Sequence, residues 1–132
     1  MMLLLAFAAM LSVGAEQPAR PDFAPFLQSW EGESKCTIPT SPCHDEHVIY
    51  KTKLTESKML ISMYKVVNGE KLYMGDLECA TRRGDTISCT IPNRNANEWV
   101  FTLKGSELEG TLYLDQERTI YRKIRVAKKA TK

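Results

Sequence analysis

Residues 98–114 read EWVFTLKGSELEGTLYL, and this stretch indicates the fold class. Apolar and polar side chains alternate on both sides of Gly105-Ser106, as expected for two antiparallel strands joined by a two-residue turn. Because side chains in a strand repeat every two residues, a slip of one position would turn every apolar side chain to the wrong face. The turn at Gly105-Ser106 keeps them on one face by pairing Leu103 with Leu108, Phe101 with Gly110, and Trp99 with Leu112.

The rest of the chain repeats this pattern. Runs of β-branched and aromatic residues recur about every ten residues and are separated by turn residues, which is typical of an antiparallel meander. The expected strands span 29–36, 44–54, 58–67, 71–80, 85–91, 98–104, 107–114 and 119–126. A closed barrel is favoured over an open sheet, because closure leaves no unpaired sheet edge. We therefore predict an all-β, eight-stranded antiparallel up-and-down barrel, preceded by one helical turn that begins at Asp22.

The four cysteines are expected to form two disulfides. Six and nine residues separate the members of the two pairs, whereas structural zinc sites use closer pairs such as C-x2-C. A three-residue turn centred on Gly84 places Cys79 opposite Cys89, at a distance that suits a disulfide. Cys36 and Cys43 flank a loop with two prolines, and a bond between them would join the first strand to the second.

A three-residue turn at 115–117 would continue the hairpin of residues 98–114 into the last strand. The expected pairs are Leu112 with Ile120, Gly110 with Arg122, and Leu108 with Ile124. The core face would then carry one arginine, opposite a glycine that leaves room for it.

The hairpin at Asn68-Gly69 leaves two alternatives open. Its type I′ turn sets Met63 opposite Met74 and Tyr64 opposite Tyr73, and both of its faces are apolar. Uninterrupted strands would turn the methionines outward, whereas a bulge at Gly75-Asp76 would turn them inward. We favour the bulge, and in both cases some apolar surface of this hairpin faces solvent or a partner.

The N-terminal residues indicate export. Met1–Leu11 is apolar and uncharged, and small residues follow up to Ala15, so we expect a signal peptide that is cleaved before Glu16. The protein would then be periplasmic or secreted, with no integral membrane span after cleavage. The expected organisation is a signal peptide at 1–15, a lead and helical turn at 16–28, a barrel at 29–126 and a basic tail at 127–132.

Composition excludes several classes of protein. The 132 residues are 43% hydrophobic and 26% charged, which is typical of a globular domain. The net charge is only +2 and the basic residues are dispersed, so nucleic acid is not an expected partner.

Residues 43–47 read CHDEH and hold both histidines of the chain. On a strand, His44 and Glu46 would face one way and His47 the other, so too few ligands share a face for a firm zinc site. We expect a solvated strand entrance, with His44 and His47 only as low-ranking metal ligands. No nucleophile motif is present, and we expect no catalytic residues, no cofactor and no enzyme activity.

The combination of an exported chain, a meander barrel, a first-strand tryptophan and a last-strand arginine resembles the small lipocalin-like members of the calycin superfamily. The resemblance rests on Trp30 and Arg122, and it implies that Arg122 packs on Trp30 and closes the barrel. It also implies a small apolar or carboxylate-bearing ligand inside the barrel. The expected ligand-binding residues are Tyr50, Met63, Met74, Phe101, Leu112 and Arg122.

Two functions follow as expectations. The first is an exported, non-enzymatic binding module that holds such a ligand, although the same side chains would also serve simply to fill a small barrel. The alternative is a protein-interaction or inhibitor domain that acts through the outer surface and loops of the barrel.

Overall fold

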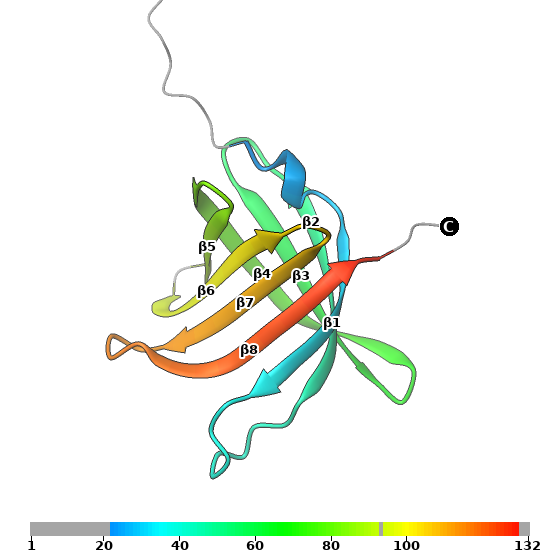
Figure 1. Cartoon of the computed structure of the whole chain (residues 1–132), viewed down its shortest axis with the longest axis vertical. Helices are drawn as coiled ribbons and strands as arrows, with labels where there is room; N and C mark the ends of the chain where they lie inside the picture. The colour runs from blue at the N-terminus through cyan, green and yellow to red at the C-terminus, as the bar shows by residue number, and fades with distance from the viewer. Residues whose placement is uncertain (1–21, 93, 130–132) are drawn as a thin grey trace, which may run out of the picture.

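The computed structural model describes residues 22–92 and 94–129. Within them, eight antiparallel strands follow one another in chain order, and the last pairs with the first to close a barrel (Figure 1). The predicted fold class is confirmed. The strands are β1 (Ser29–Cys36), β2 (Glu46–Leu54), β3 (Met59–Val67), β4 (Glu70–Arg83), β5 (Thr86–Ile91), β6 (Arg94–Lys104), β7 (Glu107–Leu114) and β8 (Thr119–Lys128). The predicted signal peptide at 1–15 and the last residues of the predicted tail lie outside the described residues.

Three strands are longer than the sequence pattern predicts. β4 continues to Arg83, β8 continues to Lys128, and β6 begins at Arg94 rather than at residue 98. The ladder continues through polar residues there, as the pairing of Ile91 with Arg94 shows. The hydrophobic pattern marks only those parts of a strand that touch the core, so polar strand ends are missed.

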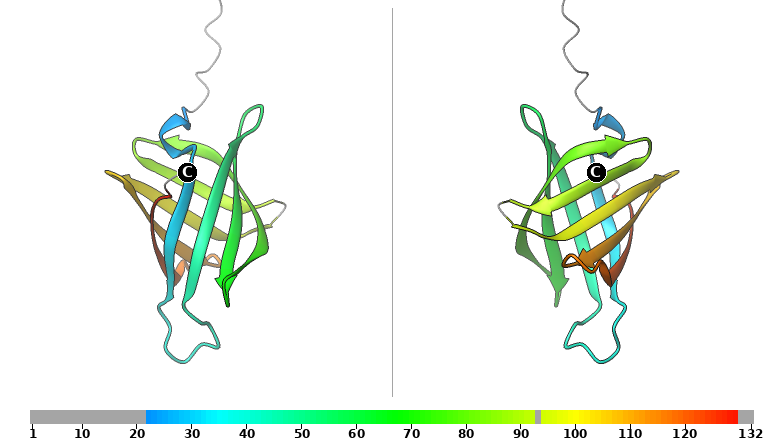
Figure 2. Two further views of the ribbon diagram at one scale, coloured as in Figure 1. Left: turned by 90° about the vertical axis from the view of Figure 1, so that its right-hand side faces the viewer. Right: turned by 90° about the vertical axis from the view of Figure 1, so that its left-hand side faces the viewer.

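The expected helical turn is a 3-10 helix, η1 (Ala24–Phe26), which covers one end of the barrel (Figure 2). The Asp22 carboxylate accepts a hydrogen bond from the Ala24 N–H at 3.0 Å. Phe23 and Phe26 are buried beneath the turn. We call this the upper end of the barrel, and we call the opposite end, which carries the loop between β1 and β2, the lower end.

The hairpin between β6 and β7 has the predicted register, with Phe101 opposite Gly110 and Leu103 opposite Leu108. Gly110 leaves room for the Phe101 ring, because a Cβ atom at position 110 would lie 2.6 Å from it. Tyr50 meets Phe101 edge to face, with 5.8 Å between the ring centroids. These contacts fill the middle of the barrel.

Both predicted disulfides are present, Cys36–Cys43 and Cys79–Cys89, and no cysteine of the described residues is free. Cys79 lies opposite Cys89 as expected, but the turn is shorter than predicted. Arg83 pairs directly with Thr86, and a bulge on β4 between Cys79 and Thr81 restores the register. Both sulfur atoms of this bridge belong to fully buried residues of the core.

The predicted register between β7 and β8 is wrong by two residues. The connection has four residues, 115–118, with Asp115 and Arg118 at positive φ, and a bulge follows between Leu112 and Tyr113. Leu112 therefore lies opposite Arg122 instead of Ile120. In the same way, Gly110 lies opposite Ile124, and Leu108 lies opposite Val126. Because the total slip is an even number, Arg122 keeps its predicted place on the inner face.

The hairpin between β3 and β4 contains a bulge, as favoured above, but Met74 is the extra residue. Tyr64 pairs with Tyr73 as predicted, whereas Met63 pairs with Gly75, whose φ is +119°. Met63 is buried, and Met74 is exposed. The prediction that both methionines turn inward is therefore correct for Met63 and wrong for Met74.

Candidate functional site

The lower end of the barrel brings together four polar side chains from four different strands. Arg122 of β8 reaches across β1 to Glu46 of β2, with 3.0 Å between Nη2 and Oε1. Its Nη1 donates to the hydroxyl of Ser34 at 3.2 Å and to the Ser34 carbonyl at 3.3 Å. Lys65 of β3 lies 3.9 Å from the second Glu46 oxygen. We call these four residues the lower polar cluster.

The lower polar cluster is partly removed from water and carries unequal charge. The side chains of Arg122 and Glu46 are 15% and 19% exposed. One carboxylate faces two cations, and no other carboxylate of the described residues forms an ion pair with Arg122 or Lys65. The lower polar cluster therefore holds two positive charges and one negative charge, and charges in such a partly buried setting are screened less than those on an open surface.

Tyr50 lies on the inner face of the barrel, two positions beyond Val48 along β2. Burial raises the pKa of the Tyr50 phenol, the Glu46 carboxylate raises it further, and Arg122 acts in the opposite direction. Both members of the ion pair therefore act on the phenol electrostatically. The phenol stays neutral at physiological pH and keeps its proton for hydrogen bonding.

Apolar side chains lie next to the lower polar cluster on the side of the barrel interior. Trp99, Leu112 and Met63 retain between 6% and 8% exposure, whereas Leu77 and Phe101, nearer the middle of the barrel, have none. Leu112 is the direct register partner of Arg122. We call this part of the lower end the mouth: it combines the lower polar cluster with apolar side chains that keep a small exposure.

The hairpin of β3 and β4 extends beyond this mouth (Figure 1). Four large apolar side chains near its turn are exposed, and we call them the hairpin tip: Val67 (42%), Leu72 (41%), Tyr73 (59%) and Met74 (38%). The prediction that this hairpin leaves apolar surface exposed is confirmed. Leu72 pairs with Lys65, so the hairpin tip is continuous with the lower polar cluster.

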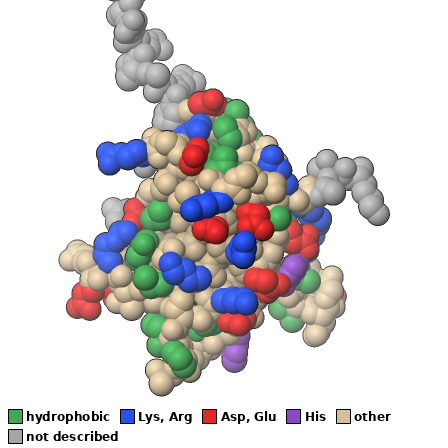
Figure 3. Space-filling view, viewed as in Figure 1, with side chains coloured by type: hydrophobic (Ala, Val, Ile, Leu, Met, Phe, Trp, Pro, Cys, Tyr) green, Lys and Arg blue, Asp and Glu red, His purple; other side chains and the backbone are tan. Residues whose placement is uncertain are grey.

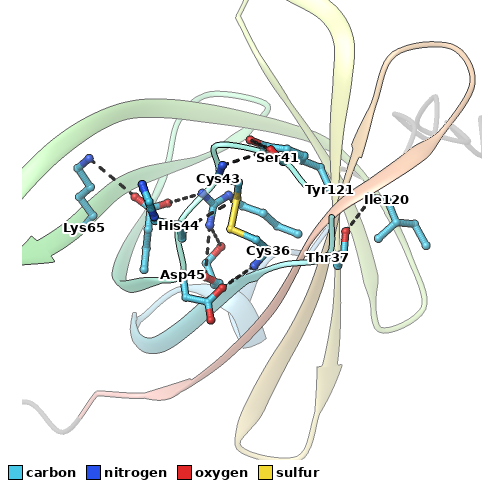
Figure 4. The surroundings of a disulfide bond; sticks show 12 residues. Cys36, Thr37, Ser41, Cys43, His44, Asp45, Lys65, Ile120 and Tyr121 are labelled. Atoms are coloured by element: carbon cyan, nitrogen blue, oxygen red, sulfur yellow. Dashed lines mark hydrogen bonds and ion pairs between the residues drawn. A yellow bond between two sulfur atoms is a disulfide. The ribbon is translucent and has the colours of Figure 1, made fainter. Parts of the chain in front are cut away.

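The loop between β1 and β2 forms the other part of the rim and is held at both sides (Figure 4). The Cys36–Cys43 bridge joins its ends, and the Asp45 carboxylate accepts from the Cys36 N–H at 2.8 Å. The Thr37 hydroxyl donates to the Ile120 carbonyl at 2.6 Å. These bonds tie the loop to β1 and β8, so the rim is largely preorganised.

The six predicted ligand-binding residues separate into three groups. Leu112 is the register partner of Arg122 at the lower mouth, and Met63 lies two residues before Lys65 on β3. Tyr50 and Phe101 pack on each other in the middle of the barrel, and Met74 lies outside. Their role in ligand binding remains a prediction.

The predicted closure of the barrel by Arg122 on Trp30 is wrong. Trp30 pairs with Lys128 and Cys36 pairs with Arg122, so about 20 Å of strand separates the two side chains at roughly 3.3 Å per residue. The Trp30 indole N–H instead donates to the Phe26 carbonyl at 3.1 Å.

The predicted cluster at 43–47 is divided among three environments. His44 is exposed in the loop, Glu46 turns into the barrel, and His47 faces outward. His47 lies between two carboxylates of β1, 2.9 Å from Glu33 and 2.7 Å from Glu31. Hydrogen bonds to Glu33 and then Glu31 raise the pKa of His47, and the bond from His47 lowers the pKa of Glu31. No group of three potential metal ligands is found in the described residues.

The sequence pattern did not predict that Glu46, Ser34 and Lys65 belong to the candidate site. The alternation of β2 contains the signal for Glu46, which shares strand parity with the inward-facing Val48 and Tyr50. Polar residues at inward positions deviate from the barrel pattern and are therefore informative.

Comparison with protein-family models and with curated proteins finds no match for this chain. Among the described residues, no helix has the length and apolar character that crossing a membrane requires. The two disulfides fit an oxidising compartment, because thiols are kept reduced in the cytosol.

Proposed function

We propose that this protein is an exported, non-enzymatic binding module that holds an amphipathic carboxylate at the lower end of its barrel. The observation that carries the proposal is the lower polar cluster, where two cations face one carboxylate, beside the exposed apolar hairpin tip. The disulfides and the expected signal peptide support export. The lipocalin-like resemblance is a further part of this proposal, and it now rests on fold rather than on Trp30 and Arg122.

The charges and the apolar surface suit the two halves of one ligand. A guanidinium can bind a carboxylate through two parallel N–H bonds, and Lys65 adds a second cation within reach of the same group. The hydrocarbon part would pack against Leu72 and Val67. Because Tyr50 and Phe101 fill the middle of the barrel, the ligand lies at the mouth rather than deep inside.

The test is a titration of the purified protein with a fluorescent fatty acid and with its uncharged methyl ester. We expect saturable binding of the acid and at least about tenfold weaker binding of the ester, since loss of one ionic hydrogen-bonded contact costs about 1.5–3 kcal/mol. Extraction with organic solvent followed by mass spectrometry would identify a ligand that is retained from the cell.

Two variants locate the site. Leu72→Ser should weaken binding of the acid, whereas Leu54→Ser, at an exposed leucine of the upper end, should leave it unchanged. Absence of saturable binding, equal binding of acid and ester, or equal effects of the two variants would overturn the proposal.

A second candidate function, protein interaction, is supported by the outer face of the same hairpin. Lys51 and Lys71 lie 5.4 and 5.6 Å from the centre of the Tyr64 ring, which packs in a tilted arrangement beside the exposed Tyr73. Neither lysine pairs with a carboxylate in the part of the chain that the structure describes, and the proximity of Lys51 lowers the pKa of Lys71. This surface fits a partner protein that presents carboxylates around an apolar patch.

A pulldown with matched lysine variants tests this second function. We expect a stoichiometric protein partner that is lost with Lys71→Glu and retained with Lys53→Glu, which changes an exposed lysine on the same strand as Lys51. Equal capture by both variants would exclude this surface.

A further inference from the structure

A groove on the outer wall of the barrel is separate from the lower mouth. It crosses β6, β7, β8 and β1 and has a volume of about 520 Å³. Figure 3 faces the β6 to β8 part of this wall, where cationic and anionic side chains are interspersed. The volume lies within the range of about 300–1,000 Å³ that is usual for small-molecule sites.

One row of residues across the groove carries charges of alternating sign. Arg125 of β8 has Glu109 on one side and Glu33 on the other as register partners. Its Nε also lies 2.9 Å from Glu107, and Glu33 is further bound to His47. Charges of opposite sign alternate along this row, which stabilises neighbouring strands.

The adjacent row carries charges of one sign only. Lys35 of β1 lies directly opposite Lys123 of β8, and Thr111 of β7 is the next register partner. The Lys123 ammonium donates to the Thr111 hydroxyl at 3.0 Å, and neither lysine forms an ion pair within residues 22–92 and 94–129. Like charges directly opposite each other destabilise a pair of strands, so an anion between them would remove a cost as well as add contacts.

We propose that this row is a binding site for the oxyanion group of a small polar ligand, carried as a carboxylate, sulfate or phosphate. Lys35 and Lys123 supply charged donors, and the Thr111 hydroxyl can donate or accept. The carboxylates of Glu33 and Glu109 beside it, which repel a second negative charge, limit the site to one anionic group. This inference is independent of the function proposed for the lower mouth, because the two sites face opposite sides of the barrel wall.

The test is an NMR titration of the ¹⁵N-labelled exported protein at constant ionic strength. The probes are inorganic sulfate, inorganic phosphate and glucuronate, with glucose as the uncharged control. We expect saturable shifts at the amides of Lys35, Thr111 and Lys123 with at least one anion and none with glucose. The pattern among the three anions identifies which oxyanion the site prefers.

Single substitutions locate the response. Lys35→Ala and Lys123→Ala should each weaken the affinity by at least about fivefold, as loss of a charge-assisted hydrogen bond predicts. Lys128→Ala, at an exposed lysine outside the groove on the same strand, should change it by less than about twofold. Fatty-acid binding at the mouth should be unaffected by Lys123→Ala. Absence of saturable shifts, an equal response to glucose, or an equal loss with Lys128→Ala would overturn the proposal.

Discussion

The two ends of the barrel differ, although the same strands run into both. At the upper end, Phe23, Phe26 and Trp30 are buried under the 3-10 turn, and Arg82 lies 5.3 Å from the centre of the Phe26 ring. At the lower end, the ion pair of Arg122 and Glu46 takes the place that buried aromatic side chains have at the upper end. The upper end is built as a hydrophobic seal, which stabilises the fold, whereas the lower end keeps charges at a site where packing alone would favour apolar side chains.

The largest effect should come from opening the upper end. Phe26→Ala should lower the free energy of unfolding by about 3–5 kcal/mol, because it removes a fully buried ring and leaves a cavity. Leu72→Ala at the lower end should change it by about 0.5 kcal/mol or less. Urea denaturation measures both, and similar losses would mean that the two ends do not differ in this way.

The two disulfides should differ in the same way as the two ends of the barrel, one in its effect on stability and the other in its effect on binding. The bridges close loops of similar length, with sequence separations of 7 and 10, so their effects on unfolded-chain entropy are similar. Cys79→Ala with Cys89→Ala should destabilise by about 2–5 kcal/mol, because it also removes core atoms. The corresponding pair of changes at Cys36 and Cys43 should cost less stability and weaken fatty-acid binding more. The reverse order in thermal denaturation would contradict this assignment.

The ion pair of the lower end should show measurable coupling. A double-mutant cycle with Arg122→Met and Glu46→Gln should give an interaction energy of about 1–3 kcal/mol, because both groups are largely buried. The same cycle with Lys65 and Glu46 should give less, since the distance is 3.9 Å and Lys65 is more exposed. Equal coupling energies would remove the distinction between these two contacts.

The smallest effect concerns His47 on the outer wall, where Glu33 and Glu31 raise its pKa above the ordinary 6.5. A raised pKa in the folded state means that the stabilisation is complete below the unfolded pKa and is lost as the pH rises through the folded value. His47→Gln should therefore destabilise the protein by less than about 1 kcal/mol near pH 5.5 and not at all near pH 9.

An NMR titration provides the direct measurement for His47. Its midpoint should lie above 6.5, and Glu33→Gln should lower it more than Glu31→Gln does, because the bond to Glu33 has the larger effect. His44→Gln is the control, since His44 is exposed and joins no ion pair in the described residues. A midpoint at or below 6.5 would contradict the bridging arrangement.

The sequence predicted those parts of the barrel that depend on alternation and on short turns. The register at Gly105-Ser106 and both cysteine pairings followed from counting residues across turns. The Cys79–Cys89 pairing was reached through a turn one residue too long, which the bulge on β4 offsets. Counting fails where bulges occur, because an extra residue in one strand has no reliable sequence signal apart from an occasional glycine such as Gly75.

The candidate site was also predicted only in part. Here the cause is the stagger between strands rather than a bulge. Arg122 was expected on the inner face and lies there, but its partner was expected to be Trp30. Position along a barrel strand depends on the stagger between strands, which alternation does not determine. Glu46 was considered as part of a linear motif with His44 and His47, whereas strand geometry sends Glu46 and His47 to opposite faces.

The pairing of β1 with β8 has a practical consequence for the chain ends. The Lys129 N–H donates to the Ser29 carbonyl at 2.8 Å, so the described chain enters and leaves at the upper end. A fusion partner or solid support attached to either terminus would therefore hold the molecule with its charged mouth pointing into solution. A circularly permuted chain, opened in the connection at 115–118 beside Leu112 and Arg122, would place both new ends at the lower end and so test whether that orientation can be reversed.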